Sequence, residues 1–288
     1  MGKKNEVGGF RQMNIMMARN FNLMFNNKIK MGMIVIFPVA IGFLLSYVMK
    51  KNTFECFENT SSAFFSITSA AVYIGMFNSL TEICKERSVV KREYMTNMKI
   101  PSYIMSIMLV QGIVCLFQSA IMTAICYKCL KFPASDLLFK GHSFVKYYIT
   151  MFLIMYAADA MGVLISSIVK TNELANLIAP IIIIVQLVLS GVLFELKGAA
   201  EKVSYLTISH WGMSAFGRLS GINDKVPRAV FEDTKGMLTA DMLPDISKKC
   251  YEATASGLVS VWLILLGFVV VFAILSMLFL RRIEKDAR

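Results

Sequence analysis

The residues of this chain that are best suited to chemistry are charged, and they are densest between positions 82 and 100. That segment reads EICKERSVVKREYMTNMKI, in which acidic and basic side chains alternate with a minority of apolar ones. Glu86, Arg87, Arg92 and Glu93 form two adjacent pairs of opposite charge. Such groups form ion pairs and charge-assisted hydrogen bonds. The pattern suits a docking surface for another protein, although its composition fits a solvated connector at least as well.

Asp159 is the one acidic residue deep inside a long apolar run. Placing a charged side chain at the centre of a bilayer costs about 2.5–3.5 kcal/mol on insertion scales, so its carboxyl should face protein or water. It could contact a transported substrate. It could instead form a structural hydrogen bond to Gln111, Gln118 or Gln186, with the carboxyl protonated.

Motifs for catalysis and metal binding are missing from the sequence. There is no G-x-x-x-x-G-K-S/T phosphate loop, no H-E-x-x-H and no G-x-S-x-G. Cys126 and Cys129 have C-x-x-C spacing but no second pair. We therefore expect no enzyme activity, metal site or ATP hydrolysis in this chain. Cys56 and Cys250 both fall in predicted outer segments, where an oxidising compartment would allow a disulfide between them.

The elements that must position these residues are transmembrane helices. The chain has 288 residues, 56% of them hydrophobic and 17% charged, whereas soluble domains carry about 25% charged residues. A membrane-crossing helix needs about 20 apolar residues. This predicts an all-α membrane protein with six transmembrane helices, at about 31–49, 63–81, 102–127, 147–169, 177–194 and 257–280. Ala158, Gly162 and Ser166 form a ladder of small residues that predicts close helix packing.

The distribution of basic residues predicts the orientation. With the N-terminus inside, the cytosolic segments carry 16 lysines and arginines, against 6 in the two short outer loops and at the start of the helix that follows them. Basic residues concentrate on the cytosolic side of membrane proteins. We therefore expect both termini in the cytosol and a multi-pass protein of the cell membrane, in contact with its lipids. The net charge of +11 then reflects topology, and no nucleic-acid partner is expected. The first apolar run begins only near Met31, so no cleavable signal peptide is expected.

Two regions flank or interrupt the apolar runs. In 1–30, Phe10, Met13, Met17, Phe21 and Met24 recur every three or four residues, which predicts an amphipathic helix in the inner interface of the membrane. A disordered tail is the alternative. The large last outer loop, 195–256, has an aromatic start at 203–216 that predicts an interfacial or re-entrant piece, followed by a polar stretch, 221–244, over the outer mouth. The domains are thus 1–30, a connecting helix, and 31–288, a six-helix transmembrane domain.

In this order, the segments resemble the membrane domain of type-2 ATP-binding cassette (ABC) transporters, especially the G-subfamily-like permeases. The entry segment from Gln12 to Asn20 resembles the connecting helix of that family, and Glu86 to Tyr94 resembles its E-R…R-E coupling helix. The stretch from Ser190 to Phe194 resembles the small-residue element that ends the fifth helix. The aromatic segment from Ser209 to Phe216 resembles part of the last outer loop. The resemblance covers nearly the whole chain and depends on the order and spacing of these segments.

The resemblance implies a permease subunit of an ATP-driven exporter, paired with itself or with a related permease. ATP and Mg²⁺ would be bound by a separate ABC nucleotide-binding subunit. Glu86, Arg87, Arg92 and Glu93 would transmit the motion of that subunit. The substrate pathway would be lined mainly by the second and fifth helices, with Phe77, Asn78, Asp159 and Gln186 as its candidate residues. A channel, a membrane-embedded enzyme or a regulatory, mechanotransmitting subunit that moves no cargo is the alternative, and the sequence does not identify a cargo.

Overall fold

Helices make up the regular structure of this protein. The computed structural model describes residues 8–49, 53–96, 98–135, 137–138, 141–194, 196–227 and 249–281. Within these ranges, the β structure consists of one isolated parallel bridge, between Cys56 and Val226. The all-α prediction is therefore confirmed for the part of the chain that the structure describes.

Five helical runs are long and apolar enough to cross a membrane, and they coincide with five of the predicted spans. Four of them are α2 (Lys28–Val48), α5 (Ile100–Leu130), α6 (Ser143–Ile168) and α11 (Ala255–Leu280). The fifth run, Phe57–Met95, is divided into α3 (Phe57–Ser79), the short 3-10 helix η1 (Cys84–Glu86) and α4 (Arg87–Met95). Its apolar part is α3, and the charged segment follows it as predicted.

The predicted span 177–194 differs from the structure. The helix there, α7, runs from Asn172 to Val188 and is only 17 residues long. It stops because the hydroxyl of Ser190 bonds to the carbonyl of Leu187 and because Gly191 adopts a left-handed backbone with φ of 76°. A left-handed residue of this kind commonly ends a helix. The helix therefore starts earlier and ends earlier than the hydrophobic run suggests.

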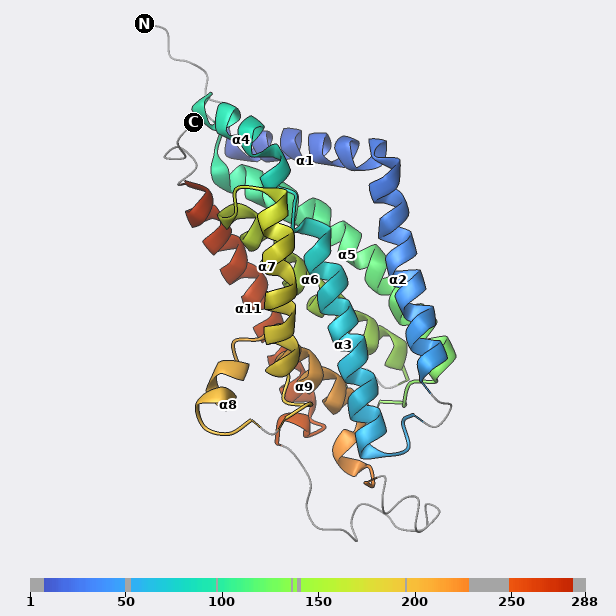
Figure 1. Cartoon of the computed structure of the whole chain (residues 1–288). Helices are drawn as coiled ribbons and strands as arrows, with labels where there is room; N and C mark the ends of the chain where they lie inside the picture. Colours follow the sequence, from blue (N-terminus) through green and yellow to red (C-terminus); the bar gives the residue numbers. More distant parts are fainter. Residues whose placement is uncertain are drawn as a thin grey trace, which may run out of the picture.

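The helices run between two ends of the molecule (Figure 1). One end carries α1 (Gly9–Asn26) and α4, and the other carries α8 (Ala199–Ser204) and α9 (Ile208–Ser220). The first long helix, α2, starts at the α1 end, and the last one, α11, finishes there. Helix α1 and the last residues of α11 thus lie at the same end of the molecule. The predicted placement of both termini on one side requires such an arrangement.

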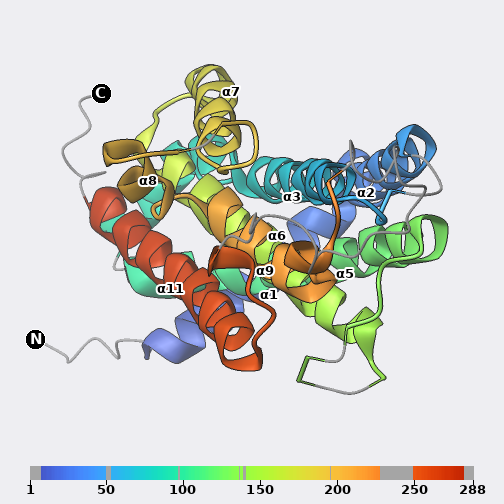
Figure 2. The ribbon, with the colours of Figure 1, turned by 90° about the horizontal axis from the view of Figure 1, so that it is seen from below.

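The core is built around α6, which lies between α3 and α11 (Figure 2). Glycines allow α3 and α6 to approach closely. A Cβ added at Gly162 would come within 2.5 Å of the carbonyl oxygen of Met76, and one at Gly75 would overlap that of Met155. At the same contact, the hydroxyl of Ser79 donates to the backbone carbonyl of Asp159 at 2.6 Å. The predicted small-residue packing face of α6 is therefore present and faces α3.

Helix α1 lies across the bundle and turns into α2 at Asn27 (Figure 1). The side chain of Asn27 accepts a hydrogen bond from the Lys30 amide at 3.0 Å and so caps α2. Met24 is buried, and Met17 and Phe21 pack beside it, in a cluster that includes Val110 and Val114 of α5. Most of the stripe predicted to face lipid therefore faces protein. Phe10 of that stripe is exposed, and so is a second apolar set made up of Ile15, Leu23 and Phe25.

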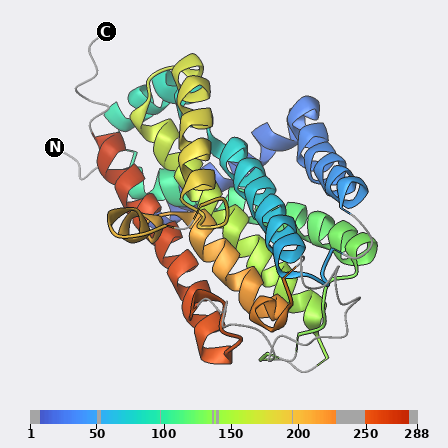
Figure 3. The ribbon, with the colours of Figure 1, turned by 60° about the horizontal axis from the view of Figure 1, so that its bottom comes forward.

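The described part of the 195–256 segment lies only partly on the outside of the bundle, and the rest packs into the core. Helix α9 is inserted against α3, α6 and α11 (Figure 3), with Phe216 and Ile208 fully buried. Gly212 permits this, since a Cβ there would lie 2.8 Å from the Thr68 side chain. The predicted interfacial piece is thus largely part of the core. Most of the predicted polar stretch, 228–244, lies outside the described residues.

Candidate functional site

The charged segment after α3 folds back under the end of α6. The hydroxyl oxygen of Ser166, in the last turn of α6, accepts hydrogen bonds from the amides of Ile83 and Cys84 at 2.9 and 3.1 Å. These bonds satisfy donors at the start of η1 that would otherwise be unpaired. The position of α4 is therefore set by α6 as well as by the helix that precedes it.

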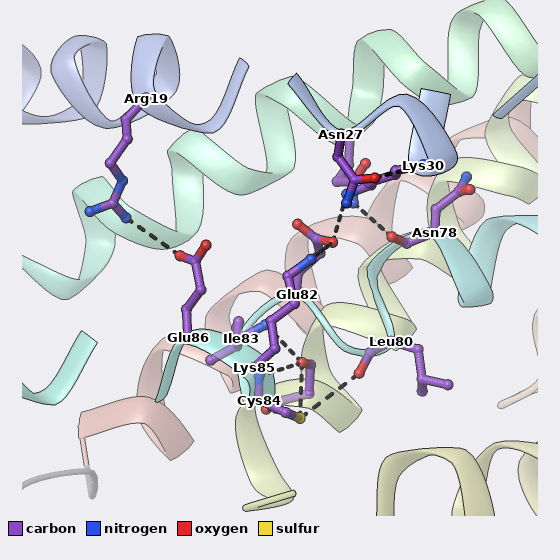
Figure 4. Close-up of polar contacts among 12 residues, drawn as sticks. Arg19, Asn27, Lys30, Asn78, Leu80, Glu82, Ile83, Cys84, Lys85 and Glu86 are labelled. Carbon is purple, nitrogen blue, oxygen red and sulfur yellow. Dashed lines mark hydrogen bonds and ion pairs between the residues drawn. The ribbon is translucent and has the colours of Figure 1, made fainter. Parts of the chain in front are cut away.

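An ion-pair cluster joins α1 to the charged segment, and we call it the Arg19 brace. The Arg19 guanidinium is hydrogen-bonded to the carboxylate of Glu93 and lies 3.7 Å from that of Glu86 (Figure 4). All three side chains are partly buried. A planar guanidinium can contact two carboxylates at once, which a single ammonium group does less well. The brace ties the N-terminal helix to both η1 and α4.

A second ion-pair cluster lies where α1 turns into α2. The Lys30 ammonium is 2.6 Å from a carboxylate oxygen of Glu82, and the Lys85 ammonium is 3.2 Å from the same oxygen (Figure 4). Burial alone would raise the pKa of Glu82, but Lys30 and Lys85 outweigh it, and the pKa of this carboxyl is lowered. Glu82 therefore stays charged and holds the start of α2 to the end of α3.

Three of the four predicted coupling residues contact other helices or the end of α6, and the fourth is exposed. Glu86 and Glu93 meet at Arg19, while the Arg87 guanidinium donates to the backbone carbonyl of Val169 at 2.9 Å, just beyond α6. Arg92, by contrast, is exposed. The exposed side of α4 also carries Ser88 and Met95, which lie four residues before and three residues after Arg92. One side of α4 is thus attached to the molecule, and the other is open to a partner.

A small cavity of about 40 Å³ lies between α1, α5 and the charged segment. Its lining includes Asn20, Lys30, Glu82, Tyr103 and Gln111. The amide nitrogen of Gln111 donates to the carbonyl of Asn78 at 3.0 Å. Polar groups therefore continue from this cavity into the interior of the bundle.

The candidate pathway residues are not gathered at one point. Asn78 hydrogen-bonds to Gln118 of α5, and Phe77 contacts the ring of Tyr73 with centroids 4.5 Å apart. Tyr73 is 41% exposed, so this side of α3 reaches the surface of the molecule. Gln186 is on α7, where its carbonyl oxygen accepts from the Ser209 amide of α9 at 3.1 Å.

Asp159 lies inside the α3–α6 contact and is fully buried. Neither of its carboxyl oxygens has a hydrogen-bond partner. The predicted hydrogen bond to Gln111, Gln118 or Gln186 is therefore wrong. The amides of Gln111 and Gln118 bond to α3 and α2, and that of Gln186 contacts α9 and Met161, so they do not reach Asp159. Asn78 and Asp159 are nevertheless close in the fold, because Ser79 bonds directly to the Asp159 backbone.

The α8–α9 end contains a larger cavity of about 470 Å³. Ser190 and Gly191 line it from the end of α7, together with Tyr205, His210 and Tyr251 from the segments that follow. Burial lowers the pKa of His210, which keeps the imidazole neutral at physiological pH. Cys250 also lines this cavity, and both Cys250 and Cys56 are thiols in the structure. Their disulfide stays a prediction.

Four residues that matter in the structure were not singled out as site residues in the sequence: Arg19, Lys30, Glu82 and Lys146. Lys146 is fully buried, and its ammonium donates to the carbonyls of Ser135 and Leu137 in the preceding loop. A lysine at a helix start carries no local signal of such burial. Arg19 and Glu93 are opposite charges in segments predicted to lie on the same side of the membrane, which is the signal that could have paired them.

Comparison with known proteins agrees with this architecture. Residues 11–217 match the model of a family described as "ABC-2 type transporter". Over 147 residues the chain is 23% identical to an ABC transporter ATP-binding/permease protein of Mycobacterium tuberculosis, an alignment that covers 50% of this chain and 17% of that protein. The match includes most of α1, the charged segment, α7 and most of α9. This multi-pass membrane protein belongs to the ABC-2 type transporter family, as one of its membrane domains.

Proposed function

We propose that this chain is the permease subunit of an ATP-driven exporter and that a nucleotide-binding subunit docks on the exposed side of α4. The observation that carries the proposal is the two-sided environment of α4. Arg92 is open to a partner, while Glu86 and Glu93 on the same segment are attached to α1 through Arg19. A push on α4 would therefore reach α1 through the Arg19 brace and α6 through Arg87.

The proposed topology has six crossings, with the α1 end in the cytosol and both termini there. The short helix α7 is the fifth crossing, and α8 and α9 lie on the extracellular side. The exposed apolar side chains of α1, Ile15 and Leu23 among them, rest against the inner leaflet. ATP and Mg²⁺ are bound by the partner. The relative from Mycobacterium tuberculosis is an ATP-binding/permease protein, which supports pairing of the two activities.

The substrate pathway lies between two copies of the chain, or between this chain and a related permease. On α3, Tyr73 is exposed and Phe77 beside it is partly buried, which supports a pathway along this helix. Asn78 is the polar neighbour of Phe77 in this lining. Asp159 and Gln186 lie behind it: both are buried, and Gln186 holds α7 to α9 through the Ser209 amide.

Co-expression with a candidate nucleotide-binding subunit tests the docking surface. Arg92→Ala should weaken the association by about 1–2 kcal/mol, roughly ten-fold, because an exposed interfacial charge is lost. Lys202→Ala, an exposed lysine on α8 at the opposite end, is the matched control and should have no effect. Co-purification and stimulated ATP hydrolysis are the measurements. Equal association of the wild type and both variants would remove Arg92 from the interface, and no association with any nucleotide-binding subunit would favour a stand-alone membrane protein.

A further inference from the structure

Few described groups act to stabilise a charge on Asp159: the Ser79 hydroxyl beside it and, from the α1 end, Lys30. Its side chain is 0% exposed, and Oδ1 and Oδ2 are both buried and without a hydrogen-bond partner. The salt bridges among the described residues do not involve it. The one hydroxyl at this point of the contact, that of Ser79, donates to the backbone carbonyl of Asp159 instead.

The titratable groups around Asp159 do not offer a counter-charge. Cys115 of α5 and Tyr156 of α6 are the ionisable neighbours within the bundle; the Cys115 sulfur accepts from the Asn78 amide, and the Tyr156 hydroxyl donates to the carbonyl of Met108. Glu82 and Lys30 act on Asp159 from the α1 end, but they form an ion pair with each other. An unpaired carboxylate at such a position costs several kcal/mol, whereas the neutral acid avoids that cost.

We propose that Asp159 is a proton-binding site of the α3–α6 contact. While the two helices are in contact, the carboxyl holds its proton. When they part, the O–H bond breaks, the proton passes to water and the carboxylate remains, hydrated. Atoms and charge balance without any further reactant.

Polar groups lead from the surface to this site. The cavity at the α1 end reaches Gln111, whose side-chain oxygen is also buried without a partner. The Gln111 amide bonds to the carbonyl of Asn78, and the next residue, Ser79, bonds to Asp159. Water that enters between α3 and α5 would meet these groups in sequence. The proton thus exchanges with the side of the membrane where α1 lies.

Binding of a proton in one arrangement and not in the other makes the arrangement depend on pH. Low pH favours the closed contact, and high pH favours its opening, because the open form is the one that has lost the proton. The proposal concerns the permease alone and does not depend on a nucleotide-binding partner.

Infrared spectroscopy of the purified permease in lipid nanodiscs tests the site. The wild type minus Asp159→Asn difference spectrum at neutral pH should contain the carbonyl stretch of one protonated carboxylic acid. The wild type minus Glu82→Gln spectrum, for a carboxyl paired with Lys30, should contain carboxylate bands only. Carboxylate bands for Asp159 would overturn the proposal.

A second measurement uses the wild type and does not require a variant to fold. Dicyclohexylcarbodiimide, an apolar reagent, modifies protonated carboxyls in membranes, and peptide mass spectrometry locates the adduct. We expect the adduct on Asp159 and none on Glu82, with less modification as the pH rises. Equal modification at all pH values, or an unmodified Asp159 together with carboxylate bands, would show that the carboxyl does not exchange a proton. Either result leaves docking of the ATPase at α4 unaffected.

Discussion

Glu82 shows how a carboxylate remains charged under partial cover of protein. Its side chain and that of Lys30 are each 22% exposed, and the two lie 2.6 Å apart. The lowered pKa of Glu82 means that the folded protein binds this proton less well than the unfolded chain does. The ion pair therefore adds stability above the ordinary pKa of a glutamate, about 4.3, and this contribution is lost as the pH falls through the lowered folded-state pKa.

Glu82→Gln should therefore lower the free energy of unfolding by about 1–2 kcal/mol at neutral pH. The difference in unfolding free energy between the variant and the wild type should shrink as the pH falls below the pKa of glutamate in the unfolded chain. Thermal unfolding in detergent across a pH series is the measurement. Glu173→Gln, at an exposed site in the first turn of α7, is the control and should run parallel to the wild type. A constant gap for Glu82→Gln down to acid pH would contradict the ion-pair argument.

At the scale of elements, the α3–α6 pair depends on glycines at the contact. Gly75→Ala should destabilise the protein by about 3 kcal/mol, because the new Cβ would overlap the backbone carbonyl of Met155, which cannot move by changing rotamer. Gly267→Ala in α11 is the matched control, since nothing lies within 4 Å of a Cβ there. Loss of secondary structure on heating is the measurement, and equal midpoints for the two variants would refute a close contact at Gly75.

At the scale of the whole molecule, the proposed topology places α4 and α8 on opposite sides of the membrane. This can be tested with Ser88→Cys and Leu206→Cys, both at exposed positions, in a Cys129→Ser background that removes an exposed native thiol. A membrane-impermeant maleimide should label Leu206→Cys on intact cells, and Ser88→Cys only after permeabilisation. Labelling of both from the same side would be incompatible with the arrangement of α4 and α8 in Figure 1.

The sequence predicts those elements that depend on length and hydropathy alone. Five spans match because an uninterrupted apolar run has no stable alternative to a helix in lipid. The end of α7 was missed because apolar composition continues to Phe194, whereas Gly191 and the Ser190 hydroxyl act against the helix locally. The burial of Lys146 could not be predicted, because its partners are backbone carbonyls of a loop with no sequence pattern of its own.

The predicted coupling residues illustrate the same limit. Charge and spacing indicated that Glu86, Arg87, Arg92 and Glu93 form a functional segment, but not which side of α4 is free. That depends on where α1 crosses, and the turn at Asn27 brings Arg19 over two of the four residues. The amphipathic spacing correctly predicts that α1 is a helix with one apolar face. It does not distinguish a face that packs against α5 from one that lies against lipid.

The shortness of α7 has a consequence for the bilayer around it. Its 17 residues span about 25 Å at 1.5 Å per residue, less than the hydrocarbon thickness of about 30 Å. The non-helical backbone that follows cannot face lipid, because its amide and carbonyl groups would lack partners. Ser190 and Gly191 instead border the cavity of about 470 Å³, which is large enough to hold water. A cargo that follows α7 in the proposed direction of export would therefore regain contact with water before it reaches the outer headgroups, so that part of its rehydration takes place inside the membrane's thickness.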